Sequence, residues 1–252
     1  MLDDHLPPLS AAQAEIGSVR TFGWSVGAVS GGETLVQSRP IVRGADVDPV
    51  DDLLRANAAC IVAAFATGAD QRTTPRDPVR IARFRRFMGA TAGPTLTEPL
   101  RRELESALPE FLARHNGSKS DSELLLMRVL ASLHEQGVFG KALAPADALR
   151  RGLVDLARIL PDEGEPMAMF VSDGRTLAVM HRAGTLLSFE PPEALRPTAR
   201  FRMDGSVAPS VPASMLVWMP GSGPSVPSAG AERIADGVLS VEASRPGELV
   251  RD

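Results

Sequence analysis

The stretch Gly117-Ser-Lys-Ser-Asp-Ser-Glu-Leu-Leu-Leu126 has the pattern of a helix start, and the rest of the chain is interpreted around it. Ser120 or Asp121 can serve as the N-cap, because a short side-chain oxygen accepts hydrogen bonds from the free amides of the first turn. Ser120 and Glu123 have the spacing of a capping box. Apolar residues then recur at helical spacing, at Leu124, Met127, Leu130 and Leu133. These residues alone predict a well-capped amphipathic helix.

Composition narrows the class of protein. The chain has 252 residues, a net charge of -4, no tyrosine and two tryptophans. The negative net charge argues against nucleic acid and anionic membranes as partners. The single cysteine, Cys60, excludes an intrachain disulfide and indicates a reducing compartment. The N-terminus lacks the pattern of a signal peptide, and no apolar run approaches the roughly 20 residues of a membrane helix. We therefore expect a cytoplasmic protein.

The first third of the chain reads mainly as strands. Two β-rich runs, residues 20–30 and 33–38, flank Gly31-Gly32 and predict a hairpin. Small residues in the first run, including Gly27, would let another backbone or a ligand approach closely. A helix over residues 48–59 and a buried strand over residues 60–67 follow. Cys60 begins that strand, and no neighbouring base marks it as a nucleophile, so it is interpreted as an inert buried thiol.

Residues 81–88 alternate weakly and predict a further strand. Arginines cluster along it, at positions Arg80, Arg83, Arg85 and Arg86. Two interpretations stay open: a solvated strand face, or a docking patch for an acidic partner.

The remaining elements predict a layered fold. Three helices are expected over residues 97–114, 120–136 and 144–160, the first interrupted at Pro109. The second half is expected to contain strands over residues 167–171, 175–182, 184–190, 199–203 and 214–219, with a turn at Asp173-Gly174. A last turn and strand are expected within residues 233–243, where Asp236-Gly237 marks another turn. We expect one domain over residues 1–252, with a poorly defined segment at 1–18 and a mobile loop at 220–230. The predicted class is α+β: a four-layer αββα sandwich of two mainly antiparallel sheets flanked by helices.

Several stretches in this order resemble class II glutamine amidotransferases, which are N-terminal-nucleophile hydrolases with an αββα sandwich. The stretches are Gly23-Trp-Ser-Val26, residues 60–67, residues 77–90, Ser120-Asp-Ser-Glu123 and Val171-Ser-Asp-Gly174. The family pattern has an N-terminal Cys, a Gly-Trp-Gly strand, a His-Val-Arg-x-Ala-Thr strand, a His-Pro-Phe loop, a His-Asn-Gly turn and Thr-Asp-Ser-Glu at a helix start. The resemblance runs from about residue 20 to the C-terminus.

The chain departs from that family at the positions that carry its chemistry. Leu2 stands where the resemblance places the nucleophilic Cys, and Ala66 where it places the arginine that grips the glutamine carboxylate. Asp77 replaces the histidine of His-Pro-Phe, and Met88-Gly89-Ala90 replaces the turn that forms the oxyanion hole. Asp121 is retained, and the resemblance assigns its carboxylate to the α-ammonium of glutamine.

One motif is similar in letters but displaced along the chain. His115-Asn-Gly117 matches the oxyanion turn of the family, yet it lies just before the predicted helix at Ser120. We interpret it as a helix terminus, with His115 near the negative end and Gly117 as the left-handed stop.

Three hypotheses for function follow from the resemblance and its departures. The first is a catalytically inactive amidotransferase-like domain that acts in binding, assembly or regulation, with Asp121 kept as a helix cap. The second is an active amidotransferase or amidohydrolase on glutamine or a γ-glutamyl compound, with a nucleophile exposed by processing of a longer N-terminus. The third is sensing of a glutamine-like small molecule through Asp121 and Trp24.

The expected partner is another protein subunit. The candidate surfaces are the arginine-rich strand at residues 80–86, if it lies at a sheet edge, and the loop at residues 219–230. The sequence predicts no cofactor and no metal site.

Overall fold

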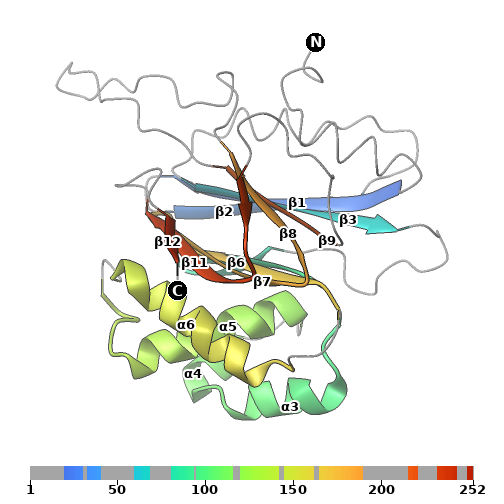
Figure 1. The fold of residues 1–252 in the computed structure, drawn as a ribbon. Coiled ribbons are helices and arrows are strands. Elements are labelled where there is room, and N and C mark those ends of the chain that lie inside the picture. Colours follow the sequence, from blue (N-terminus) through green and yellow to red (C-terminus); the bar gives the residue numbers. More distant parts are fainter. Residues whose placement is uncertain are drawn as a thin grey trace.

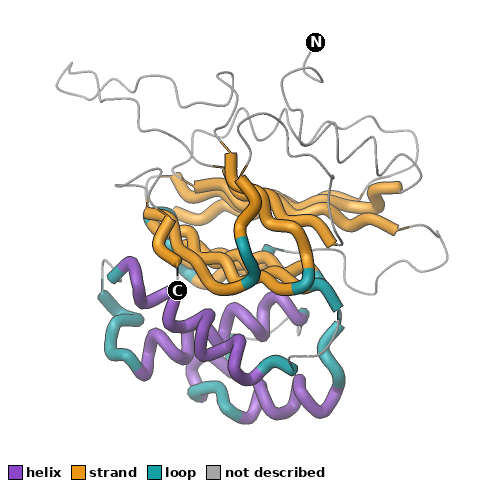
Figure 2. Tube along the Cα trace, in the orientation of Figure 1, coloured by secondary structure: helices purple, strands orange, loops and turns teal. Residues whose placement is uncertain are grey.

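A computed structural model describes the chain in three layers, which Figure 1 shows from the side. A layer of helices covers one face of a six-stranded sheet, and further strands lie over its other face (Figure 2). The described residues are 20–30, 33–40, 60–68, 81–93, 95–115, 120–141, 145–161, 165–189, 215–220, 232–242 and 249–251. The mixed helix and antiparallel sheet content agrees with the expected class. The helix predicted over residues 48–59, which would contribute to a fourth layer, lies outside the described residues.

The six-stranded sheet is antiparallel throughout and has the strand order β12-β11-β7-β6-β5-β4. Its strands are β4 (Ala82–Phe84), β5 (Phe87–Ala92), β6 (Met167–Ser172), β7 (Thr176–Arg182), β11 (Gly237–Glu242) and β12 (Leu249–Arg251). The predicted turn at Asp173-Gly174 joins β6 to β7, as expected. The Asp173 carboxylate accepts from the amides of Arg175 at 3.0 Å and Thr176 at 2.9 Å, which fixes the turn.

The prediction of one strand over residues 81–88 is wrong, because the chain reverses there. β4 and β5 form a hairpin whose two turn residues are Arg85 and Arg86, with Phe84 opposite Phe87. In a single strand Phe84 and Phe87 would point to opposite faces. The turn instead places both rings in the core beneath the helices, and burial of both aromatic side chains favours it.

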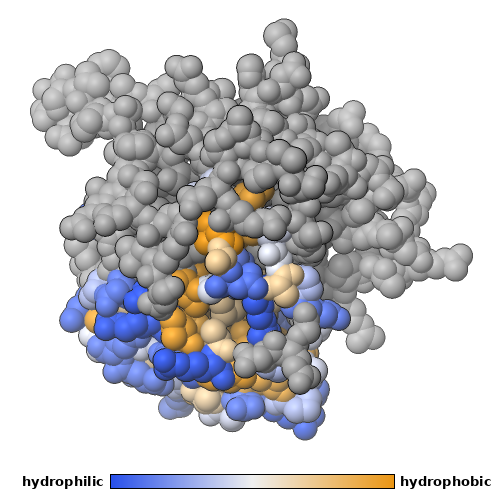
Figure 3. All heavy atoms as spheres, in the orientation of Figure 1, coloured by the Kyte–Doolittle hydropathy of each residue, from blue (hydrophilic) through white to orange (hydrophobic). Residues whose placement is uncertain are grey.

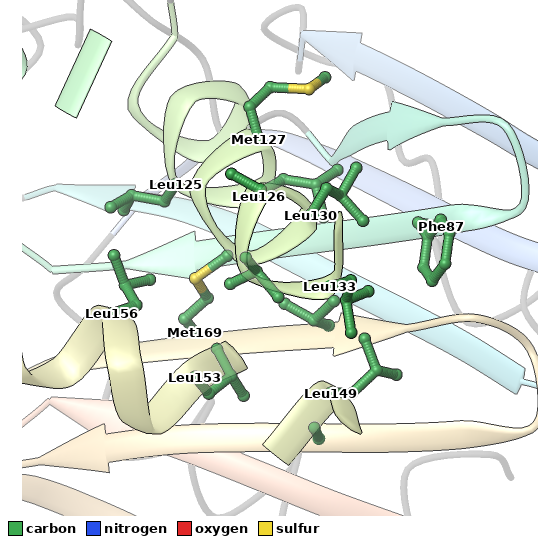
Figure 4. Packing of buried hydrophobic residues seen from close by; sticks show 14 of the residues in the cluster. Phe87, Leu125, Leu126, Met127, Leu130, Leu133, Leu149, Leu153, Leu156 and Met169 are labelled. Carbon is green, nitrogen blue, oxygen red and sulfur yellow. The ribbon is translucent and has the colours of Figure 1, made fainter. Parts of the chain in front are cut away.

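Four helices of the described residues form the outer layer: α3 (Glu98–Ser106), α4 (Glu110–Ala113), α5 (Asp121–Glu135) and α6 (Ala146–Ile159). Pro109 separates α3 from α4, as the sequence predicts. Figure 4 shows how leucines of α5 and α6 meet Phe87 and Met169 of the sheet. Gly152 lets α6 approach α5 closely, since a Cβ there would lie 3.0 Å from Val129 Cγ1. Hydrophilic residues cover much of this helical layer in Figure 3.

The layer on the other side of the sheet contains two three-stranded sheets. One has the order β2-β1-β3 and the other β10-β8-β9. Their strands are β1 (Arg20–Ser30), β2 (Glu33–Pro40), β3 (Cys60–Gly68), β8 (Gly184–Phe189), β9 (Met215–Pro220) and β10 (Glu232–Ile234). Ser30 pairs with Glu33, so the predicted hairpin is confirmed. The chain passes from β7 to β8 through Ala183, whose φ of 50° is in the left-handed region.

Apolar side chains fill the space between β5 and the strands above it. Val62, Ile81, Met88 and Ala90 form a buried cluster there. Gly27 of β1 faces this cluster closely, because a Cβ on it would lie 3.0 Å from both Ile81 Cγ2 and Met88 Sδ. The expected close approach at the first strand is therefore present, and the groups that approach are apolar side chains of the same chain.

The remaining sequence predictions concern the later strands and three segments that the structure does not describe. β8, β9 and β11 agree with predicted strands, and the predicted turn at Asp236-Gly237 lies between β10 and β11, whereas β10 and β12 were not predicted as separate strands. The segments at 1–18, 199–203 and 221–230 lie outside the described residues.

Candidate functional site

The helix start that anchors the sequence analysis is the N-terminus of α5. Ser120 is the N-cap, and its Oγ accepts from the amide of Glu123 at 3.2 Å. Asp121 is therefore the first helical residue, which corrects the interpretation of this aspartate as the cap. Its negative charge lies in the first turn, where the helix dipole favours an anion.

The Asp121 carboxylate is engaged by groups of the same chain. Its Oδ2 accepts from the backbone amide of Leu96 at 2.9 Å, and its Oδ1 pairs with the guanidinium of Arg101 on α3. The two side chains of that ion pair are 21% and 20% exposed, so water screens them only in part. The carboxylate thus joins α5 to α3 and to the segment that follows β5.

Gly89 lies in the interior of β5, so residues 88–90 do not form the turn that the resemblance places there. β5 continues to Ala92, and the chain then turns at Gly93, whose φ is 140°. A Cβ at Gly89 would lie 3.3 Å from Leu126 Cδ1, so the open face of this glycine points at α5. Met88 and Ala90, one position to each side, belong to the cluster beneath β1 and β3.

The other predicted site positions lie in the β2-β1-β3 sheet or outside the described residues. Trp24 is in β1 opposite Phe65, and the neighbouring Gly23 is opposite Ala66 of β3. Leu2 and Asp77 are outside the described residues. Asp121 therefore begins α5, and Gly89 of β5 faces the same helix. Trp24 and Ala66 lie elsewhere, in the β2-β1-β3 sheet.

His115 follows the end of α4, as the sequence predicts for a helix terminus. Its Nδ1 lies 2.8 Å from the carbonyl oxygen of Phe111, and its backbone amide donates to Leu112. The ring meets Phe84 edge to face, with 5.1 Å between the centroids. Asn116 and Gly117 are outside the described residues.

The arginine cluster lies around the β4–β5 turn, and β4 is the outermost strand of the six-stranded sheet as described. Arg83 donates to the carbonyl oxygen of Thr34 on β2 at 3.0 Å. The Arg85 guanidinium carbon lies 5.5 Å from the ring centroid of Phe84. Arg86 donates to the carbonyl oxygen of Lys141 at 2.8 Å. Arg80 is outside the described residues.

The sequence analysis missed a buried histidine on β7. His181 has a fully buried side chain, its Nε2 lies 2.9 Å from the carbonyl oxygen of Ala235, and its Nδ1 lies 3.4 Å from Asp236 Oδ1. Burial lowers the pKa of His181, while the Asp236 carboxylate and the hydrogen bond to Ala235 partly oppose that shift. The pairing of β7 with β11 brings the two residues together across 55 positions of sequence, and no local motif marks them.

A second polar group lies where α5 meets α6. Ser132 donates to the Asp155 carboxylate at 2.7 Å, and Gln136 donates to Ser132 at 3.0 Å. A shallow hollow of about 410 Å³ opens beside it, lined by Gln136, Arg150, Arg151, Val154, Asp155 and Arg158. Among the described residues, no group of three or more His, Cys, Asp or Glu side chains could hold a metal ion.

Comparisons with known proteins give similarities to solved structures. No protein family and no curated protein matches the sequence. The chain is similar to a glutamine aminotransferase class-II domain protein from Silicibacter pomeroyi, with 17% identity, 88% of each chain covered and a TM-score of 0.47. It is also similar to a predicted glutamine amidotransferase from Pseudomonas aeruginosa, with 13% identity, 93% of this chain and 94% of the other covered, and a TM-score of 0.45. No helix in the described part of the chain is long and apolar enough to cross a membrane.

Proposed function

We propose that this chain is a catalytically inactive domain of the glutamine amidotransferase type, and that it works by binding another protein. One observation carries the proposal: the Asp121 carboxylate is paired with Arg101 and bonded to the Leu96 amide. The resemblance implies that this carboxylate would bind the α-ammonium group of a ligand. Here a guanidinium of the same chain supplies the cation, so a ligand would have to displace an existing ion pair.

The apolar cluster between β5 and the strands β1 and β3 supports the proposal. Met88 and Ala90 belong to the three residues that the resemblance assigns to the oxyanion turn, and with Ile81 they form an apolar cluster that faces β1 and β3. Met88 is fully buried and lies within contact of the Gly27 position. An amide carbonyl brought among these side chains would lose its hydrogen bonds to water without gaining others, which is unfavourable.

Energetics favour inactivity over weak activity. Removing one oxyanion donor typically costs about 2.7–4 kcal/mol of transition-state stabilisation. The resemblance places Ala66 at the arginine that grips the carboxylate and Gly89 at the oxyanion asparagine, and neither residue carries a side chain that could supply such a group. Because these groups act as a unit in the resembled reaction, the loss of any one of them already removes most of the rate enhancement.

The test is ammonia release from glutamine by the purified full chain, with an active class II amidotransferase as positive control. We expect no steady release above that of buffer. Asp121→Asn, which keeps the shape of the side chain but removes its charge, should leave that background unchanged. Steady release that Asp121→Asn abolishes would refute the proposal and favour an active enzyme with a processed nucleophile.

A further inference from the structure

Four cationic residues lie at or next to the β4–β5 turn, and we call them the turn patch: Arg83, Arg85, Arg86 and Lys141, whose carbonyl oxygen accepts from Arg86. Arg83, Arg85 and Lys141 are exposed, and Arg86 is half-buried. The hydrogen bond from Arg86 to the Lys141 carbonyl oxygen, 2.8 Å long, holds the two segments together. On a chain of net charge -4, this is a local concentration of the opposite sign.

Three members of the turn patch, Arg83, Arg85 and Lys141, have contacts that leave their charge available to an outside anion. Arg83 bonds a neutral carbonyl oxygen, and the Arg85 guanidinium carbon lies over the rings of Phe84 and Phe139, at 5.5 and 5.7 Å. Within the described residues, Arg83, Arg85 and Lys141 form no ion pair with a carboxylate. The exposed arginines of the helices differ, because each pairs with an acid on its own helix: Arg102 with Glu98, Arg114 with Glu110, Arg151 with Asp147, and Arg158 with Asp155.

The backbone of Arg85 gives a second, independent observation. Its φ is 53°, at the first central position of a two-residue hairpin turn, where glycine is favoured. An arginine there strains the turn, and residues held in such conformations cluster at functional sites. The sequence keeps a cation where the fold alone favours glycine.

The position of the turn patch indicates the shape of its partner. β4 is the outermost described strand of its sheet, so its outer backbone groups face away from β5. The Arg83 side chain extends toward β2, where it bonds Thr34. The Arg85 side chain lies on the helical side of the sheet, over the rings of Phe84 and Phe139. An extended chain lying along β4 would therefore meet positive charge from both faces of the sheet.

We propose that the turn patch binds an acidic, extended segment of another polypeptide, which lies along β4. The proposal rests on the binding role proposed above and names the chemistry of the partner. Nucleic acid fits less well, because bases bind by stacking on accessible rings. The rings of Phe84 and Phe87 beneath the turn patch are only 6% and 2% exposed.

The experiment measures fluorescence anisotropy of a labelled peptide of about ten residues that alternates Glu and Val, long enough for one strand. We expect saturable binding to the full chain that weakens as salt is raised, because surface charges are screened. The double variant Arg83→Gln/Arg85→Gly should bind roughly tenfold or more weakly. Arg102→Gln is the matched control: it removes an exposed arginine of α3 and should leave binding unchanged.

Three results would overturn the proposal: no saturable binding, equal binding of a Lys-Val peptide, or an equal loss in Arg102→Gln. Tighter binding of oligothymidine than of the acidic peptide would assign the turn patch to nucleic acid instead. The single variant Arg85→Gly should also bind more weakly, and because it relieves strain its unfolding temperature should not fall, so unfolding would not explain its loss of binding. Failure here leaves the proposed inactivity standing, since ammonia release is measured without the peptide and tests that inactivity separately.

Discussion

The two faces of β5 are both buried, but they are closed in different ways. On the face toward the helices, large side chains of α5 cover the strand, and Gly89 accommodates Leu126. On the face toward β1, the side chains of Met88 on β5 and of Ile81, which precedes β4, reach across to a glycine of another sheet, Gly27. The first face is an ordinary helix-on-sheet core. The second is an apolar contact between strands of two different sheets.

The largest expected effect is on the helix face. Leu126→Ala should lower the free energy of unfolding by about 2–5 kcal/mol, because a fully buried leucine leaves a cavity. Gly89→Ala should restore part of that loss only in the Leu126→Ala background, where the added methyl has room. Urea denaturation of the single and double variants measures the coupling. Leu35→Ala, at a position 64% exposed, is the control and should change stability little. Additive effects of the pair would contradict the packing described for this face.

The second prediction addresses the face toward β1. Gly27→Ala should destabilise by about 1–3 kcal/mol, because its methyl would press on Ile81 and Met88. Met88→Ala in the same chain should relieve the part of the overlap that involves the methionine, and the coupling is again read from urea denaturation. If Gly27→Ala were neutral, an open space between the sheets would remain, and the distinction between the two faces would fail.

The third prediction concerns the start of α5. Asp121→Asn should cost about 1–3 kcal/mol, because it weakens a partly buried hydrogen bond and removes the ion pair with Arg101. Arg101→Gln should lose less in the Asp121→Asn background than alone. Asp147→Asn is a matched control, since its pair with Arg151 is about half exposed and should contribute only about 0.3–0.5 kcal/mol. Equal effects at the two aspartates would show that Asp121 is not held as the structure describes.

The fourth prediction separates function from stability at the hairpin that begins β5. Arg85→Gly should raise the free energy of unfolding by about 1 kcal/mol, because a left-handed conformation is unfavourable for residues that carry a Cβ. Arg86→Gly, at the other turn position, should not stabilise, since its φ is not in that region. Thermal unfolding of the two variants decides the matter. A destabilised Arg85→Gly would mean that the arginine is kept for the fold.

The smallest expected effect is the pH dependence set by His181, which lies on β7, away from both faces of β5. Burial lowers its pKa below 6.5 in the folded chain, so the unfolded chain takes up a proton first as pH falls. The stability from the neutral ring is complete above pH 6.5 and decreases as pH falls toward the folded pKa. His181→Gln should flatten this dependence in urea denaturation between about pH 5 and 7.5. An unchanged slope would contradict the assignment.

Sequence reasoning found the elements that local chemistry determines. The Ser120 cap, the break at Pro109 and the turn at Asp173-Gly174 each depend on a side chain acting within a few residues. It failed at Arg85-Arg86, since a two-residue turn without Gly, Asn or Asp carries no turn signal. The reversal is driven instead by burial of Phe84 and Phe87 in one core.

The candidate site was less predictable than the fold. The retention of Asp121 was visible in the sequence, but its ion pair with Arg101 depends on how α3 packs beside α5. His181 and Asp236 lacked any signal, because strand pairing alone brings them together. Contacts of this kind depend on tertiary packing, which residue patterns do not specify.

Calorimetric titration of glutamine into the full chain tests the central claim most directly. The account predicts no saturable heat, because Arg101 already pairs with the Asp121 carboxylate and apolar side chains fill the space between β5 and β1. Saturable heat that disappears in Asp121→Asn would contradict it, and would show that a ligand still reaches the start of α5.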